Sequence, residues 1–83
     1  MKSDNELLNR ITVNTKVMVG KPVIRGTRLT VGLILDRLAH GSTTEEIVEE
    51  YQGITTEDVR ACLLFAGKSL ESISFLPLAA GNE

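Results

Sequence analysis

The sequence predicts a small, mainly α-helical domain of three helices with a helix-turn-helix outline and a short N-terminal β element. Extended, β-branched runs are confined to the first third of the chain, and apolar residues recur at helical spacing after Thr30. Two capping-box signals, Thr43 with Glu46 and Thr55 with Asp58, each begin two residues after a glycine. A chain of 83 residues is one domain with a small core. Helices joined by short glycine-containing turns are typical of helix-turn-helix domains.

The β element is predicted at residues 11–31, after a partly ordered segment at 1–10. Residues 1–8 of that segment are expected to be either frayed or a short helical turn. One or two short strands are expected before Gly20, and a turn or bulge is expected at Gly26. The extended runs are residues 11–13, 17–19, 23–25 and 27–29. If these segments leave strand edges unpaired, the edges would pair with another chain. We therefore expect a homodimer.

Three helices are predicted at about 31–40, 44–52 and 56–71, and glycines end the first two. Each helix has an apolar stripe that should face the core. The stripe residues are Val31, Ile34, Leu35 and Leu38 in the first helix, Ile47, Val48 and Tyr51 in the second, and Val59, Cys62, Leu63, Ala66 and Leu70 in the third. This arrangement makes residues 11–72 the folded domain.

The C-terminal tail, residues 73–83, is apolar around Pro77, which cannot continue a helix. Its large side chains are Phe75, Leu76 and Leu78. One interpretation is that they fold back and complete the core. The other is that they form an extended anchor for a toxin or a second subunit, and on this interpretation they are partner-binding residues.

Charge is unevenly distributed along the chain. Residues 1–41 carry seven cations and three acids, whereas residues 42–83 carry two cations and eight acids. This polarity suggests a front half that binds anions and an acidic rear half that could meet a basic partner. The alternative is that the two halves of the sequence do not correspond to faces of the fold.

The segment Gly20–Arg28 concentrates glycines, a proline and cations, and it is the strongest candidate for a functional site. It is not a phosphate-binding P-loop, because Gly26 is not followed by lysine and a hydroxyl residue. The candidate nucleic-acid contacts are Lys16, Lys21, Arg25 and Arg28. The alternative is that the two arginines pair with acids of the second and third helices. Docking of the third helix in the major groove is unfavourable, because Glu57 and Asp58 occupy its first turn.

Catalysis finds no support in the sequence, and we expect no enzyme, cofactor, metal or small-molecule substrate. His40 lies in the last turn of the first helix, and Cys62 falls on a buried stripe. The second helix carries four glutamates that lack a metal-binding pattern and form a solvated face. Aromatic residues are too few for a base-stacking surface. With a single cysteine and no signal or membrane segment, we expect a cytoplasmic protein that does not bind membranes.

Several blocks of the chain resemble the bacterial family filed as domain of unknown function number 433. The matching blocks are Gly20–Arg28, Val31–Leu38, Glu45–Ile47 and Ile54–Ala61, within roughly residues 11–70. The resemblance implies a homeodomain-like or winged-helix-like fold with a short β element. It also implies relatedness to VapB-type antitoxins, which are often encoded beside a PIN-like toxin nuclease. Thr44 departs from the family's frequent proline at the first helical position.

Two functional hypotheses follow. In the first, the chain is a VapB-like antitoxin that binds a PIN-like toxin and also binds DNA as an autoregulator. In the second, it is a protein-interaction module that has the helix-turn-helix fold but does not bind DNA. A neighbouring gene for a small nuclease would favour the first hypothesis.

Overall fold

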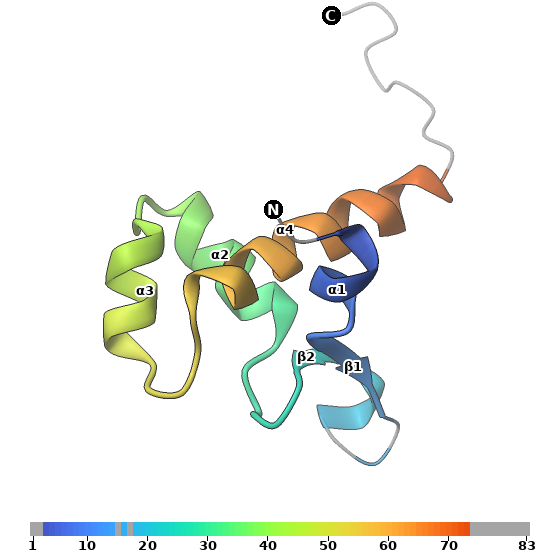
Figure 1. The fold of residues 1–83 in the computed structure, drawn as a ribbon, viewed down its shortest axis with the longest axis horizontal. Helices are drawn as coiled ribbons and strands as arrows, with labels where there is room; N and C mark the ends of the chain where they lie inside the picture. Colours follow the sequence, from blue (N-terminus) through green and yellow to red (C-terminus); the bar gives the residue numbers. More distant parts are fainter. Residues whose placement is uncertain (1–2, 15, 17, 74–83) are drawn as a thin grey trace, which may run out of the picture.

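The computed structural model describes residues 3–14, 16 and 18–73, and these form a mainly helical domain with a short two-stranded sheet (Figure 1). The elements are α1 Asp4–Leu8, β1 Ile11–Val13, the 3₁₀ turn η1 Met18–Gly20, β2 Pro22–Ile24, α2 Val31–Ala39, α3 Thr44–Glu50 and α4 Thr56–Glu71. The predicted mainly α class with a β element near the N-terminus is confirmed. Helix α1 corresponds to the short helical turn that was one of the two alternatives for residues 1–8.

Local capping signals set where the helices begin. Helices α3 and α4 start with the two capping boxes predicted from the sequence, at Thr43 and Thr55. Helix α1 has a third box, in which the Ser3 hydroxyl accepts a hydrogen bond from the Glu6 amide (3.2 Å) and the Glu6 carboxylate accepts one from the Ser3 amide (2.9 Å). A five-residue helix is unstable alone, and α1 lies against α4 (Figure 1).

The β element pairs within the chain. Strands β1 and β2 are antiparallel, with Ile11 opposite Ile24, and Thr30 forms a further bridge to Val23. The turn predicted at Gly26 is confirmed, with φ +82°. Of the one or two strands expected before Gly20, the structure has one, because Val19 has φ 55° inside a 3₁₀ turn and cannot continue a second strand. The segments whose unpaired edges motivated the homodimer therefore pair with each other.

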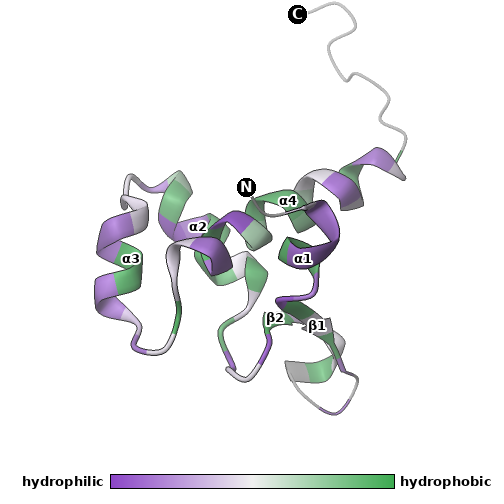
Figure 2. Cartoon of the chain, viewed as in Figure 1, coloured by the Kyte–Doolittle hydropathy of each residue, from purple (hydrophilic) through white to green (hydrophobic). Residues whose placement is uncertain are grey.

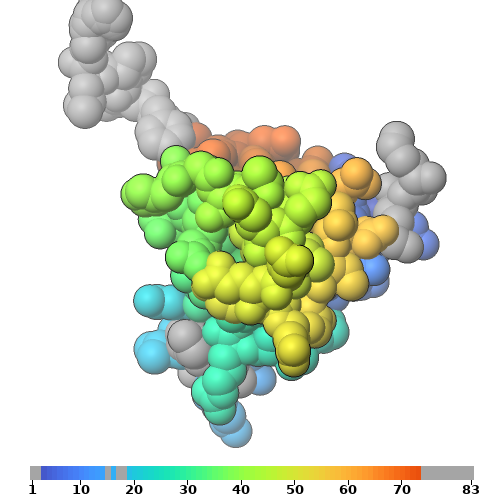
Figure 3. Space-filling view, turned by 90° about the vertical axis from the view of Figure 1, so that its left-hand side faces the viewer, coloured from blue at the N-terminus to red at the C-terminus, as the bar shows by residue number. Residues whose placement is uncertain are grey.

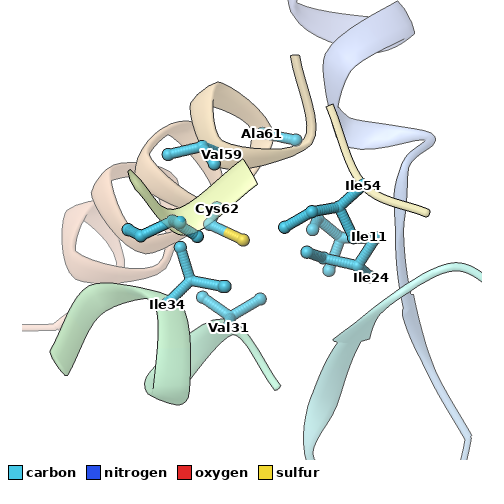
Figure 4. Close-up of a cluster of buried hydrophobic side chains, with 9 residues drawn as sticks. Ile11, Ile24, Val31, Ile34, Ile54, Val59, Ala61 and Cys62 are labelled. Atoms are coloured by element: carbon cyan, nitrogen blue, oxygen red, sulfur yellow. The ribbon is translucent and has the colours of Figure 1, made fainter. Parts of the chain in front are cut away.

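The core joins the β element to the helices (Figure 4). Its buried members are Ile11, Ile24, Val31, Ile34, Ile47, Ile54, Val59, Ala61 and Cys62. The inward stripes predicted for α2 and α3 are confirmed, since their remaining members pack against this cluster while partly buried. The β element is thus part of the same core as the helices, which fixes its position on the domain.

The predicted stripe of α4 is partly wrong. Val59 and Cys62 are buried as expected, but Leu63 is 51% exposed and Leu70 is 52% exposed. Ala61 is fully buried instead. The reason is that α1 covers one side of α4 while α2 and α3 cover another, so the buried face is turned toward Ala61. Hydrophobic periodicity shows that a helix has an apolar face but does not show which neighbours will cover it.

Phe75, Leu76 and Leu78 lie outside the described residues, so the two interpretations of the tail stay predictions. None of the helices in the described ranges is long and apolar enough to cross a membrane.

Candidate nucleic-acid interface

The four cations predicted to contact nucleic acid are all exposed. Lys16 lies in the connection between β1 and β2, and Lys21 directly precedes β2. Arg25 and Arg28 lie in the connection between β2 and α2. Both connections lie at the lower edge of the molecule in Figure 1, whereas α3 lies at its left. We call these four residues the basic end.

The turn that carries Arg25 and Arg28 is held by two hydrogen bonds of the Thr27 hydroxyl, one donated and one accepted. The Thr27 hydroxyl donates to the carbonyl of Ile24 (2.7 Å) and accepts from the amide of Leu29 (3.0 Å). Gly26 supplies the left-handed backbone conformation that the turn requires. The two arginines therefore project from a short, internally bonded turn.

Arg25 is also tied to the segment that follows α1. Its amide donates to the carbonyl of Arg10 (2.7 Å), and its side-chain Nε donates to the carbonyl of Asn9 (2.8 Å). The side chain nevertheless remains exposed. One nitrogen of the guanidinium is thus anchored, which holds the group in place while leaving its charge unneutralised.

Neither Arg25 nor Arg28 forms an ion pair with any acid in the described part of the chain, so the predicted alternative of pairing with helix acids is not realised. Of the three other arginines, Arg10 and Arg37 are paired with acids, whereas Arg60 on α4 is exposed and forms no ion pair in the described part of the chain. Arg10 bonds Asp58, and Arg37 bonds Glu50. The structure therefore separates two kinds of arginine, those engaged by acids and those left to solvent.

The Arg10–Asp58 pair was not predicted, and it lies next to the basic end. The carboxylate of Asp58, which is 6% exposed, accepts hydrogen bonds from the Thr55 amide (2.8 Å) and from Arg10 Nη1 (3.1 Å). A cleft of about 420 Å³ lies between Arg10 and Arg25. No local pattern could link Arg10 to Asp58, because they are 48 positions apart. Only the capping role of Asp58 was visible in the sequence.

Acids gather on α3 and at the start of α4. We call Glu45, Glu46 and Glu49 of α3 together with Glu57 of α4 the acidic face. Figure 2 shows α3 as hydrophilic apart from one turn, and Figure 3 shows α3 standing in front of the helices with the β element below it. Next to this face, Glu50 pairs with Arg37 and raises its pKa, and the Arg37 guanidinium lies 5.7 Å from the centre of the Tyr51 ring.

The acidic face extends from α3 onto the first turn of α4. The helix dipole stabilises negative charge in the first turn of α4, but the same charge repels DNA phosphate. The basic end and the acidic face thus differ in sign and belong to different elements of the fold.

The reactive side-chain types occupy unreactive settings. Cys62 is fully buried, and burial raises the pKa of its thiol to about 12. His40 is exposed at the end of α2, with its Nδ1 atom 2.8 Å from the carbonyl oxygen of Asp36. Across the described ranges, no three His, Cys, Asp or Glu residues group in a way that could hold a metal ion.

Comparison with known proteins identifies relatives of the same type. The family described as "Protein of unknown function (DUF433)" matches residues 11–66. A crystal structure of a DUF433 member protein from Anabaena variabilis ATCC 29413 is 28% identical, with a TM-score of 0.72 over 81% of this chain and 66% of that one. This chain therefore spans slightly less than two thirds of that protein's length. No curated protein matches the chain.

Proposed function

We propose that this chain, which belongs to the DUF433 family, is an antitoxin-like regulator that contacts DNA phosphates through its basic end and binds a PIN-like toxin nuclease. The observation that carries the DNA-binding part is the contrast among the four arginines of residues 1–41. Arg25 and Arg28 are exposed and form no ion pair in the described part of the chain, although acids elsewhere engage Arg10 and Arg37. Exposed cations held by a hydrogen-bonded turn are suited to phosphate oxygens.

The proposed binding mode uses the DNA backbone rather than base edges. We interpret α3 and α4 as the helix-turn-helix pair, joined by residues 51–55. In standard docking the start of α4 would enter the major groove, but Glu57 lies there and remains partly exposed, whereas Asp58 is buried and paired with Arg10. Phosphate contacts from the basic end avoid this repulsion. Such contacts position a protein on DNA but carry no direct sequence information.

The test is the salt dependence of binding to a short DNA duplex, measured by fluorescence anisotropy. Four phosphate contacts predict a slope of log K against log salt of about −3.6, and a dimer that engages both basic ends predicts about twice that slope. Replacing Arg25 and Arg28 by alanine should weaken binding to every sequence and reduce the slope by about 2 for each chain bound. The fold should survive, because both side chains are exposed.

Lys68→Glu is the matched control, because it changes the net charge by the same amount at an exposed site on α4. It should leave the salt slope nearly unchanged. Equal losses in the control and the double variant would mean that net charge alone drives the binding. Absence of salt-dependent binding by the unmodified chain would refute the DNA-binding proposal.

The toxin-binding part of the proposal rests on the apolar tail residues Phe75, Leu76 and Leu78, supported by the family resemblance. Removing residues 73–83 and co-purifying the chain with the product of the adjacent gene tests it. Lost capture at unchanged thermal stability supports the anchor. Lost thermal stability supports the core interpretation instead, and unchanged capture and stability refute both.

A second candidate function is a protein-interaction module that does not bind DNA, and the acidic face favours it. Glu45 and Glu49 are exposed beside a cleft of about 350 Å³ that also borders Val48 and Thr56. Glutamates arranged in this way would complement a basic surface on a partner protein. Under this function Glu45→Lys combined with Glu49→Lys should abolish capture of the partner, and the arginine variants should have no effect. Neither function assigns a catalytic role to the chain.

A further inference from the structure

The outer side of α4 is apolar in the middle, although it faces solvent. Leu63 and Leu70 are 51% and 52% exposed, and Gly67 lies between them. Together with Arg60 these residues alternate spacings of three and four, which places them on one side of the helix. Buried Ala61 and Cys62 occupy the other side, and buried Val59 borders the stripe at its N-terminal end. We call Arg60, Leu63, Gly67, Leu70 and Glu71 the outer stripe.

Gly67 is not required by the packing of its own chain. A Cβ atom placed there would meet nothing within 4 Å. Glycine inside a helix destabilises it by about 1 kcal/mol relative to alanine. A glycine flanked by exposed leucines instead leaves a shallow gap into which a side chain of a second helix can fit.

The two ends of the outer stripe carry opposite charges. Arg60 is exposed near its N-terminal end and Glu71 is exposed at its C-terminal end. No ion pair within the described ranges engages either residue. Two copies of α4 aligned in parallel would place like charges together, whereas an antiparallel alignment places opposite charges together. The charge pattern therefore matches a second copy of the same helix in one direction.

We propose that the outer stripe is the interface of an antiparallel homodimer. A two-fold axis level with Phe65 places Leu63 over Gly67 of the second copy and Arg60 beside Glu71 of the second copy, and symmetry repeats both contacts. The stripe is about 17 Å long, since a helix rises about 1.5 Å per residue. An interface this short is smaller than a standard one, so the dimer should dissociate upon dilution.

This proposal goes beyond the DNA-binding function and does not depend on it. The dimer is measured without nucleic acid, and the basic-end variants leave α4 unchanged. Dimerisation through α4 would also leave both basic ends of the dimer open, because the β element lies on a different part of the domain (Figure 1).

Sedimentation velocity of the full chain, from micromolar to millimolar concentration, tests the interface. The unmodified chain should pass from 9.0 kDa toward twice that mass. Leu63→Glu should weaken the dimer at least about tenfold, while Val13→Glu, at an exposed apolar site on β1, should not. Arg60→Glu and Glu71→Arg should each weaken the dimer, and the two changes combined should restore it.

Four outcomes would overturn the proposal. The first is a chain that stays monomeric at millimolar concentration. The second is a dimer that Leu63→Glu does not weaken, and the third is a failure of the charge-reversed pair to restore dimerisation. The fourth is a monomer that Leu63→Glu destabilises thermally, because residues of the same chain would then cover the stripe. Circular dichroism of each variant establishes that it is folded.

Discussion

Arg10 and Arg28 carry the same functional group into opposite environments. Arg10 is bonded to a buried acid between α1 and α4, whereas Arg28 is exposed beyond β2 and forms no ion pair in the described part of the chain. The difference shows that the cations of the front half are not equivalent. Asp58 and Glu50 of the rear half form ion pairs with Arg10 and Arg37. The cations of the basic end remain available to an external anion.

The largest expected effect is the loss of the acid that makes Arg10 structural. Asp58→Ala should lower the free energy of unfolding by about 2–4 kcal/mol, because it removes the carboxylate that accepts from the Thr55 amide in the capping box of α4 and leaves Arg10 without its partner. Denaturant unfolding measures it. Glu57→Ala, one residue earlier and less buried, should cost much less. Equal costs at the two positions would show that Asp58 has no special structural role.

The next effect concerns the alkaline stability of the helical region. Folding raises the pKa of Cys62 to about 12, from about 8.5 in an unfolded chain, because burial disfavours the thiolate. Below pH 8.5 the Cys62 thiol is protonated in both the folded and the unfolded chain, so its full contribution to the free energy of unfolding is present there. As the pH rises toward 12, the unfolded chain loses the proton first, and stability should fall by no more than about 1.4 kcal/mol per pH unit.

Urea midpoints recorded between pH 8 and 10 check this prediction. The variant Cys62→Ala should be less stable at neutral pH because of the cavity that it creates. Its stability should nevertheless vary less with pH over this interval. An identical pH dependence in both proteins would assign the effect to other groups.

Replacing Arg10 or Arg28 by alanine should change the free energy of unfolding by a smaller amount than the loss of Asp58, and the two variants should differ from each other. Arg10→Ala should cost about 1–2 kcal/mol, because it leaves the buried carboxylate of Asp58 without its cation while the bond from the Thr55 amide remains. Arg28→Ala should change stability by less than about 0.5 kcal/mol. A double-mutant cycle between Arg10 and Asp58 isolates the pair. If Arg28→Ala proved the more destabilising variant, the division into structural and available arginines would be wrong.

Local chemistry explains what the sequence could predict. The starts of α3 and α4 are signalled by Thr43 and Thr55, because a capping box lies within four residues. Helix α1 has the same signal at Ser3, but it is too short to show an apolar period, so the sequence left open whether this segment is frayed or a short helical turn. The turn at Gly26 was predictable because glycine is favoured at positive φ.

Tertiary packing explains what the sequence could not predict. The exposure of Leu63 depends on which sides of α4 are covered by other elements, and periodicity does not contain that information. The left-handed conformation of Val19 is rare for a β-branched residue and has no local signal. The four cations of the basic end were identified from their positions in the β element, within and beside the glycine- and proline-containing segment Gly20–Arg28. Their exposure, and the engagement of Arg10 instead, required the structure.

The smallest expected effect concerns the geometry of the basic end rather than its charge. Thr27→Val removes the hydroxyl that bonds Ile24 and Leu29, so the turn carrying Arg25 and Arg28 should become less ordered. DNA affinity should fall about threefold, because ordering the turn on binding costs free energy. The salt slope should stay the same, because no charge is lost. A reduced slope would mean that the variant has lost phosphate contacts outright.

The most direct test of the central claim is a titration of the isotopically labelled chain with a short DNA duplex, followed by amide chemical shifts. We predict that the perturbed amides cluster around Lys16, Lys21, Arg25 and Arg28, and that those of the acidic face stay unchanged. Perturbation centred on the first turns of α4, or an absence of perturbation at low salt, would contradict the assignment of DNA contact to the basic end.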